Sequence, residues 1–439
     1  MRNPIVSHAR KLMHQVLRRA FASFPRSTRF AVYRSFVDCD PAPDKRLVLK
    51  IAETREELEA CFRLLHDAYV SSGFMKPDPS GMRVTIYHAL PTTTTLCALY
   101  DGEVVGTMSL IRESVFGFPL QAVFDLTDVR EKKGNIAEVS ALAVHPKFRK
   151  TGGAILFPLM KFMYEYCTTF FDTRHLVIAV NPNRIEMYES LLFFQRLKES
   201  AVDAYDFANG APAVGASLDL YGAPEVFRQV YSGKPARKDL HAYFTQVTLP
   251  NIVIPNRRYF VTNDPVMTPA LLDHFFNQRT SVFKSLEDRK KVLLHSIYDL
   301  PEYSAVLPPV PQAVAAQHPM RKHRRYSMRC PGSIAVDDPV AHDSGAYPFQ
   351  LIELSNAGFQ AYSPIPLPLN VWGDATVHLG KTEVSRLKAM AVRDKTNGFN
   401  GFYGFQLAEP DLVWRKCVGA LEAGQTHSDL ENSTIFLTA

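Results

Sequence analysis

The chain has 439 residues, of which 46% are hydrophobic and 21% are charged, and its formal net charge is +6 at pH 7. This length is enough for two or three domains, each with its own core. The six cysteines form neither a CxxC pair nor a Cys/His cluster with zinc spacing. We therefore expect no metal site, and reduced thiols in a cytoplasmic protein. No apolar run reaches about 18 residues, so the sequence predicts no membrane-spanning helix.

Residues 1–30 are basic and amphipathic. They contain seven Lys or Arg residues and no acidic residue, and apolar residues recur at helical spacing from Ile5 to Phe24. Such a helix fits the surface of a membrane, which would make the protein peripheral on its inner face. A transit peptide, or docking of the apolar face on the protein's own core, fits the same pattern. The apolar positions are never contiguous, which argues against a secretory signal.

The next elements are marked by local signals. VLKIA, at residues 48–52, reads as a strand, and Thr54 with Glu57 reads as a capping box that opens a helix. Residues 95–111 form two runs of alternating residue type with Asp101-Gly102 between them, and this pattern predicts a hairpin.

The stretch from Glu138 to Ala154 reads as a buried strand, a glycine turn and a helix. A short apolar run ends at His145-Pro146, and Gly152-Gly153 then opens an apolar helical pattern. A turn of this kind presents free backbone N–H groups and a positive helix end, which can hold a phosphate. It lacks the spacing of a P-loop or of a dinucleotide motif, so an ordinary strand–turn–helix remains the alternative.

The order of these parts resembles the acyl-donor motif of the GNAT N-acyltransferase superfamily, V-x-P followed by R-x-x-G-x-A. Over residues 48–230 the ordered set resembles, more specifically, the FeeM-like long-chain N-acyl amino acid synthases, which are relatives of acyl-homoserine lactone synthases. Asn181 and Tyr188 match the spacing of the superfamily's Asn and Tyr, whereas Leu192 stands where Gly is usual. The resemblance implies a mixed α/β sheet flanked by helices. In it, the strand at 176–182 splays from the strand at 139–144 and opens a slot for a pantetheine arm.

The resemblance also implies a reaction, the transfer of a long-chain acyl group from an acyl thioester to the α-amine of an amino acid. The amine must lose a proton, and Glu138, at the start of the central strand, is the first candidate for the base. Tyr188 is the family-like proton donor to the leaving thiolate, and Asn181 is the third predicted catalytic residue. Backbone N–H groups near Leu142–Val144 would stabilise the oxyanion. The donor's pantetheine arm would contact Leu142, Val144, Arg149, Gly152, Gly153 and Ala154. An ion-paired strand-end Glu138 and an ordinary half-buried Tyr188 are the alternatives. The family favours acyl carrier protein over CoA as the carrier.

The second half of the chain divides at a proline-rich stretch. Residues 262–298 read as helices that begin at Pro269, after Thr268, and at Ser285, and 301–320 carry five prolines and read as a linker. Short strands with Gly/Asn turns follow, which predicts a small antiparallel barrel. The barrel resembles the PilZ domain, which binds cyclic di-GMP. Its motif residues would be Arg321, Arg325, Ser355 and Gly358, with Glu353 standing where Asp or Asn is expected.

Four segments are therefore expected. They are a basic N-terminal segment (1–46), a GNAT-like N-acyltransferase domain (47–250), a helical segment with a linker (251–318) and a PilZ-like domain (319–430). We expect acyl carrier protein, an amino acid and cyclic di-GMP as partners, and no nucleic-acid polymer. Two alternatives stay open, a synthase of the acyl-homoserine lactone type and a non-catalytic cyclic di-GMP receptor with a decayed acyltransferase fold. Leu192 in place of Gly is the feature that favours the receptor.

Overall fold

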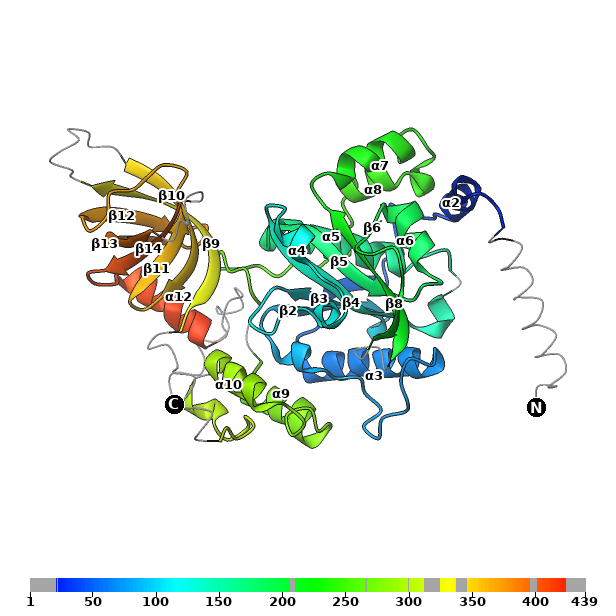
Figure 1. Cartoon of the computed structure of the whole chain (residues 1–439), viewed down its shortest axis with the longest axis horizontal. Coiled ribbons are helices and arrows are strands. Elements are labelled where there is room, and N and C mark those ends of the chain that lie inside the picture. The colour runs from blue at the N-terminus through cyan, green and yellow to red at the C-terminus, as the bar shows by residue number, and fades with distance from the viewer. Residues whose placement is uncertain are drawn as a thin grey trace.

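A computed structural model describes residues 21, 23–149, 151–205, 210–264, 267–298, 300–311, 324–336, 346–394 and 401–423. It contains a mixed sheet covered by helices, called here the sheet body (residues 23–252), and a closed antiparallel barrel (residues 326–422). Figure 1 shows the two side by side, with helices α9 and α10 below them. Within these described ranges, no helix combines the length and the apolar character needed to cross a membrane. Residues 1–20, in the predicted amphipathic segment, and Arg321, in the predicted cyclic di-GMP motif, lie outside the described residues.

The sheet has eight strands in the order β1-β2-β3-β4-β5-β8-β6, and β7 pairs with β8. Their bounds are Leu47–Ile51 (β1), Thr93–Tyr100 (β2), Glu103–Arg112 (β3), Asn135–Val144 (β4), Thr173–Val180 (β5), Gln195–Arg196 (β6), Val202–Tyr205 (β7) and Ala211–Asp219 (β8). All neighbours are antiparallel except β4 and β5. The fold is the mixed α/β sheet with helices that the sequence predicted.

Helices cover both faces of this sheet because side chains alternate along each strand. Leu96 and Ala98 of β2 face the core under α5 (Leu156–Phe170), whereas Cys97 faces the core under α3 (Arg55–Ser71). The remaining helices of the sheet body are α2 (Arg26–Ser35), α4 (Thr127–Arg130), α6 (Ile185–Leu192), α7 (Ala223–Tyr231) and α8 (Leu240–Thr245), with short 3₁₀ turns at Ile86–Ala89, Pro119–Ala122, Pro146–Phe148 and Ala236–Lys238.

Two local predictions are confirmed in the sheet body. The Thr54 side chain accepts a hydrogen bond from the Glu57 N–H at 3.1 Å, and the Glu57 carboxylate accepts one from the Thr54 N–H at 3.3 Å. Asp101 and Gly102 both have positive φ angles, +52° and +82°, and they join β2 to β3. Two such residues in succession are what a tight hairpin turn requires.

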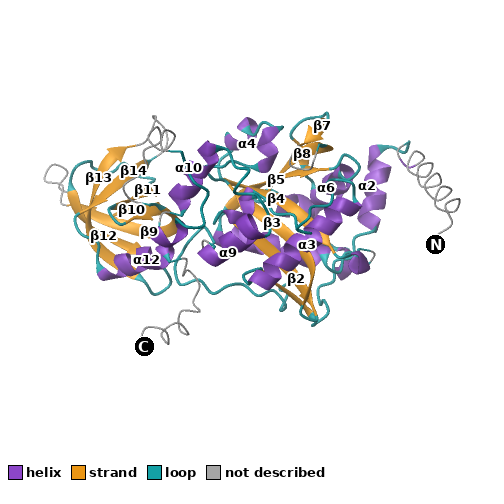
Figure 2. Cartoon of the chain, turned by 90° about the horizontal axis from the view of Figure 1, so that it is seen from below, coloured by secondary structure: helices purple, strands orange, loops and turns teal. Residues whose placement is uncertain are grey.

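The helical segment (residues 267–311) packs on α3. It consists of α9 (Pro269–Asp273), a π-helix (His274–Gln278), α10 (Asp288–Ile297) and a 3₁₀ turn (Pro301–Tyr303). Figure 2 shows α9 lying beside α3 over the sheet. The Thr268 side chain caps α9 as predicted. The second helix begins at Asp288 rather than at Ser285, because the Ser285 hydroxyl donates to the Val282 carbonyl and does not cap a helix.

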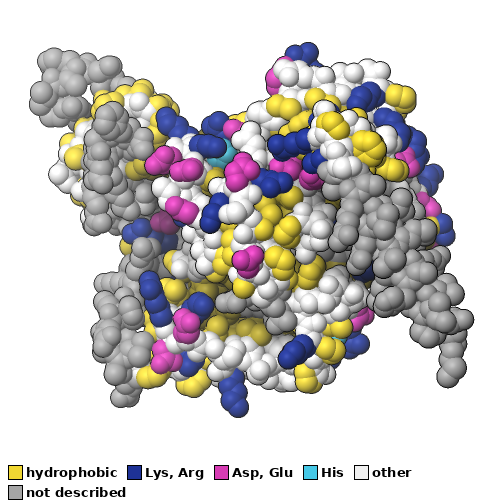
Figure 3. Space-filling model, turned by 45° about the vertical axis from the view of Figure 1, so that its right-hand side comes forward, with side chains coloured by type: hydrophobic (Ala, Val, Ile, Leu, Met, Phe, Trp, Pro, Cys, Tyr) yellow, Lys and Arg dark blue, Asp and Glu magenta, His cyan; other side chains and the backbone are white. Residues whose placement is uncertain are grey.

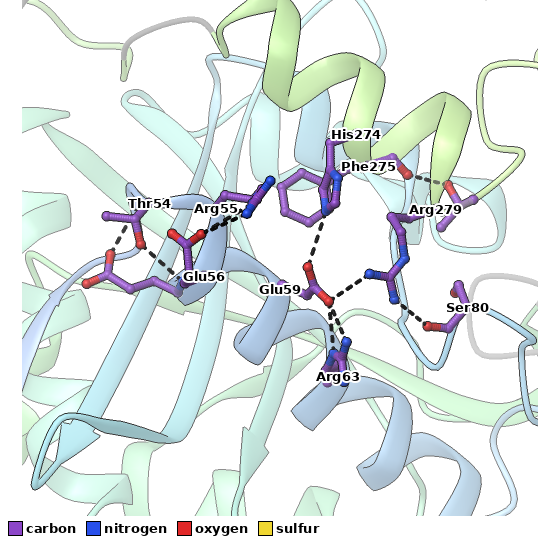
Figure 4. A network of polar contacts seen from close by, with 11 residues as sticks. Thr54, Arg55, Glu56, Glu59, Arg63, Ser80, His274, Phe275 and Arg279 are labelled. Atoms are coloured by element: carbon purple, nitrogen blue, oxygen red, sulfur yellow. Dashed lines mark hydrogen bonds and ion pairs between the residues drawn. The ribbon is translucent and has the colours of Figure 1, made fainter.

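Glu59 of α3 holds the helical segment in place. Its carboxylate accepts hydrogen bonds from His274 Nε2 at 3.2 Å, from Arg279 Nη1 at 2.9 Å and from Arg63, as Figure 4 shows. Burial opposes the ionisation of Glu59, but the hydrogen bonds from Arg63 and His274 outweigh it and lower its pKa to about 2. Arg279 also donates to the Ser80 carbonyl, which ties the loop after α3 to the same segment.

The barrel closes in the order β10-β11-β14-β13-β12-β9 and confirms the predicted barrel. Its strands are Tyr326–Val336 (β9), Ala346–Ser355 (β10), Gly358–Tyr362 (β11), Trp372–His378 (β12), Val384–Asp394 (β13) and Phe402–Leu407 (β14), and α12 (Leu412–Glu422) packs on them with Trp414 in the core.

The connector (residues 253–264) joins the two bodies through backbone pairing. The Val253 N–H donates to the Leu49 carbonyl at the edge of the sheet. Farther along, Tyr259 pairs with Gly380 and Val261 pairs with Met328, and both connector side chains are buried in the barrel core. The connector is therefore part of both structures.

Candidate active site

A slot opens in the middle of the sheet. β4 and β5 pair only as far as Glu138 and Val177. Beyond this point β4 continues beside β3 to Val144, and β5 continues beside β8 to Val180. A cavity of about 540 Å³ lies along the gap between them. The register thus confirms the splayed strands expected from the family resemblance.

A β-bulge lies on the β4 side of this slot. Thr107 of β3 pairs with Ala143, but Ser109 pairs with Ser140, so two residues of β4, Ala141 and Leu142, face one residue of β3. Ala141 adopts the left-handed backbone conformation, with φ +53°. A bulge leaves a backbone group outside the regular ladder. Ala141 and Leu142 both line the cavity, and Leu142 begins the stretch where the sequence placed the oxyanion donors.

Glu138 lies where β4 and β5 separate, and it lines the cavity. It is 1% exposed, and its Oε2 accepts a hydrogen bond from the Leu120 N–H at 3.0 Å. Burial raises the pKa of Glu138 to about 8, although the Leu120 hydrogen bond opposes this rise. Among the residues that the structure describes, Glu138 has no ion-pair partner. Burial and the charge of Glu138 together raise the pKa of the neighbouring Tyr87 hydroxyl to about 12.

Tyr188 and Asn181 belong to the turn and helix that follow β5. The Asn181 Oδ1 accepts a hydrogen bond from the Asn183 N–H at 3.0 Å, and its carbonyl accepts one from the Arg184 N–H at 2.8 Å. Asn181 therefore shapes the turn that starts α6. Tyr188 lines the cavity from α6, and burial raises the pKa of its hydroxyl. That hydroxyl makes no hydrogen bond to any other described residue, so it is available to a ligand.

The departure at Leu192 has a structural explanation. The left-handed residue that ends α6 is Phe193, with φ +60°, and not Leu192. The helix therefore does not need the backbone freedom of glycine at position 192. Leu192 lines the cavity instead. Leucine at position 192, the feature that favoured the receptor alternative, is therefore compatible with this helix end.

The glycine turn before α5 has the backbone that the sequence predicted. Gly152 and Gly153 have φ angles of +66° and +97°, and a Cβ on Gly153 would lie 2.5 Å from the Phe157 ring. No side chain caps the start of α5. Arg149 donates from Nε to the Val144 carbonyl at 2.8 Å, so its guanidinium closes the loop between β4 and the turn.

Two residues at this turn were not found from the sequence. A Cβ on Gly152 would lie 2.8 Å from Asp38 Oδ2, so the Asp38 carboxylate lies against the turn. Arg237 donates from Nε to Asp38 Oδ1 at 2.6 Å and from Nη1 to Asp40 at 2.6 Å. No local signal could reveal this contact, because the two arms come from opposite ends of the sheet body.

Much of the cavity wall is apolar. It includes side chains from α5, α7 and α8, namely Met160, Met163, Phe227 and Phe244, together with Tyr69 and Phe74. The sequence did not assign α7 and α8 to the site. A cavity that combines an apolar wall with one buried carboxyl can take a substrate with a hydrocarbon chain and a reacting polar group.

Comparison with known proteins finds one family model that matches part of the chain. Residues 60–219 match the family model described as FeeM, N-acyl amino acid synthase. Over these residues the chain carries a FeeM-type N-acyl amino acid synthase domain. That family is one of N-acyltransferases. No curated protein sequence matches the chain.

Similar solved structures each cover less than half of the chain. FeeM, described as an N-acyl amino acid synthase from uncultured soil microbes, is 25% identical, with 41% of this chain and 94% of FeeM covered and a TM-score of 0.35. BjaI, described as a CoA-dependent acyl-homoserine lactone synthase, is 20% identical, with 47% and 92% covered and a TM-score of 0.35. The acyl-homoserine lactone synthase LasI is 14% identical, with 48% and 98% covered and a TM-score of 0.33.

Proposed function

We propose that the FeeM-type domain, with residues 47–250 as its extent, transfers a long-chain acyl group from an acyl thioester to the α-amine of an amino acid. The observation that carries this proposal is the position of Glu138. A carboxyl with a pKa of about 8 faces a largely apolar cavity of about 540 Å³, at the point where β4 and β5 separate. The reaction needs such a group, because only the neutral amine attacks a thioester.

In the proposed reaction the amine nitrogen forms a bond to the thioester carbon, and the carbon–sulfur bond breaks. Glu138 takes the proton that the nitrogen loses. Tyr188 donates a proton to the leaving sulfur, so the overall proton transfer is from nitrogen to sulfur. The bulge N–H groups near Leu142 stabilise the negative charge on the carbonyl oxygen. Asn181 fixes the turn that orients Tyr188.

The glycine turn is proposed to hold the phosphate of the pantetheine arm. Gly152 and Gly153 offer backbone N–H groups in the turn before α5, with Arg149 at its edge. Ala154 completes the turn, and its own N–H donates to the Thr151 carbonyl at 3.3 Å. Leu142 and Val144 line the path of the arm beside β4. Exposed Lys147 and Arg149 are compatible with an acidic acyl carrier protein, which we propose as the donor. Comparison of acyl carrier protein with CoA thioesters of the same chain tests that choice.

The test is product formation by Glu138→Gln. We expect N-acyl amino acids in lipid extracts of bacteria that produce the chain, and at least a 100-fold loss of product with Glu138→Gln. Glu103→Gln, at an exposed site on β3, is the matched control and should keep full activity. Because Glu138 must be ionised to act, kcat/KM should rise with pH up to about 8. Equal product from Glu138→Gln would contradict the proposal, and lactone products would indicate the homoserine-lactone alternative instead.

We further propose that the barrel is PilZ-like and that cyclic di-GMP, bound to it, regulates the transferase. Arg325 and Glu353 form a half-exposed ion pair at 3.1 Å on the outside of the barrel. Ser355 and Gly358 lie at the hairpin that follows, with the Ser355 hydroxyl donating to the Gly358 carbonyl. A Cβ on Gly358 would lie 2.2 Å from the Phe405 carbonyl, so close strand packing also requires this glycine.

Calorimetric titration with cyclic di-GMP tests the barrel. Arg325→Gln should weaken binding at least tenfold, and Arg415→Gln, at an exposed site on α12, should not. Binding without any change in acyl transfer at saturating nucleotide would contradict the regulatory role.

We also propose that the N-terminal segment (1–46) contacts a membrane, where a long-chain product would partition. In its described part, Phe24 and Phe36 flank α2 and are 52% and 73% exposed. Removal of residues 1–30 should reduce sedimentation with anionic vesicles, and unchanged sedimentation would argue against this contact.

A further inference from the structure

A second cavity, of about 330 Å³, lies at the seam between the sheet body and the barrel, and is called here the seam cavity. Its wall comes from the end of α5, the connector, β9 and the turn between β12 and β13. Figure 3 shows the molecule hollowed between the barrel and the larger body. The cavity is separate from Arg325, Glu353, Ser355 and Gly358, none of which lines it.

The charged residues that line the seam cavity are all basic. They are Arg257, Arg329 and Lys381. Arg329 forms an ion pair with Asp172 at 3.2 Å and is 48% exposed. Lys381 is exposed and makes no ion pair with any described residue. The wall therefore presents two accessible cations, one of them without a counter-charge.

A buried cluster that includes Arg257 adds to this charge. Asp264 forms ion pairs with Arg257 Nη2 at 2.6 Å and with Arg112 Nη2 at 3.3 Å. The three side chains are 9% exposed or less. Two guanidinium groups against one carboxylate leave an excess of one positive charge. The Nε of Arg257 is buried and has no hydrogen-bond partner among the described residues. An excess buried charge is costly unless an anion lies near it.

The rest of the wall is aromatic and apolar. Phe170, Tyr259 and Phe260 line the seam cavity, and the Arg257 guanidinium lies 4.7 Å from the centre of the Phe170 ring. A free inorganic ion would leave this surface without a contact. A ligand with a flat or apolar part would cover it.

We propose that the seam cavity binds a small organic anion, whose phosphate or carboxylate group is held by Arg329 and Lys381 and whose body packs on the half-buried Phe170 and Phe260. Such a ligand would contact both bodies at once. It would therefore favour the docked arrangement of the barrel on the C-terminal end of α5. Met160 and Met163 of the same helix line the cavity beside Glu138, so the seam ligand would act on the helix that shapes the candidate active site.

Titration of the full chain with three probes tests the proposal. The probes are phenyl phosphate, benzoate and inorganic phosphate, used at constant ionic strength with the unfolding midpoint and calorimetric heat as readouts. We expect phenyl phosphate or benzoate to raise the unfolding midpoint in a saturable way. Which of the two binds better shows whether the site prefers a phosphate or a carboxylate. Inorganic phosphate should bind at least tenfold more weakly than the better aromatic probe, because it cannot contact the aromatic wall.

The decisive variant is Arg329→Gln combined with Lys381→Gln, which should weaken binding of the better probe at least tenfold. Both side chains are exposed, so the fold should survive the change. The matched control is Arg386→Gln with Lys388→Gln, two exposed sites on β13 outside the cavity, which should bind as the unmodified chain does. No saturable response to any probe, or the same response from both double variants, would overturn the proposal.

Discussion

Glu138→Gln should make the protein more stable at high pH while it removes activity. In the folded protein the pKa of Glu138 is raised to about 8 by burial, whereas in the unfolded chain it returns to its ordinary value near 4.5. The folded state therefore holds a proton that the unfolded chain releases. This group's contribution to stability is complete below the unfolded pKa and is lost as the pH rises towards the folded pKa.

The magnitude follows from the two pKa values. Each tenfold change in proton affinity corresponds to about 1.4 kcal/mol. The loss is below about 1 kcal/mol at pH 5, roughly 3 kcal/mol at pH 7 and roughly 5 kcal/mol above pH 8. A glutamine of the same shape can still accept the Leu120 hydrogen bond, and it carries no charge to bury. The variant should therefore gain stability over the unmodified chain by about these amounts.

Urea unfolding of both proteins at pH 5, 7 and 9 measures this difference. We expect the two unfolding free energies to diverge as the pH rises, with Glu103→Gln following the unmodified chain throughout. A constant difference between pH 5 and pH 9 would refute the reasoning, because it would mean that Glu138 ionises equally in the folded and unfolded chains. A gain in stability with a loss of activity is typical of a residue kept for function.

Three other predictions concern charge and backbone. Asp264→Asn should lower the free energy of unfolding by roughly 3–5 kcal/mol, because it leaves two buried guanidinium groups unpaired. The control Asp374→Asn, at an exposed site, should change it by less than about 0.5 kcal/mol. Equal losses for the two variants in urea unfolding would contradict this. Gly153→Ala should raise KM for the acyl donor severalfold with a smaller change in kcat, because φ is +97° there, and an unchanged KM would remove the turn from the donor site. Asp38→Asn should lower KM for a phosphate-bearing donor severalfold, because it removes a negative charge beside the glycine turn. Asp40 contacts the same arginine, and Asp40→Asn should leave KM unchanged. Equal effects of the two changes would count against a phosphate at this turn.

The parts that sequence reasoning placed well depend on neighbours in the chain. The Thr54 cap, the Asp101-Gly102 turn and the glycine turn before α5 are each fixed by residues within a few positions of one another. Glu138 could be singled out because it is an acid that begins an apolar run, although β4 itself begins three residues earlier, at Asn135. Its raised pKa could not be foreseen, because it depends on burial by segments distant in the chain.

Other features depend on contacts that no local pattern encodes. Asp38 lies against the glycine turn and binds Arg237, and α8 contributes Phe244 to the cavity wall, only because the sheet brings these segments together. The proline-rich stretch shows the same limit. Tyr303 and Leu307, in the part expected to be a linker, are buried against the helical segment, because apolar side chains between the prolines find a core to pack on.

The chain contributes to the barrel core on two separate occasions. Tyr259 and Val261 belong to that core, but residues 267–311 then pack on the sheet body before β9 begins. During synthesis on the ribosome, Tyr259 must wait until Gly380 has emerged before it finds its backbone partner. The barrel core can therefore be completed only after the helical segment has been synthesised. A fragment that starts at residue 324 would lack Tyr259 and Val261, which are part of the barrel core. The barrel is therefore not a self-contained C-terminal domain.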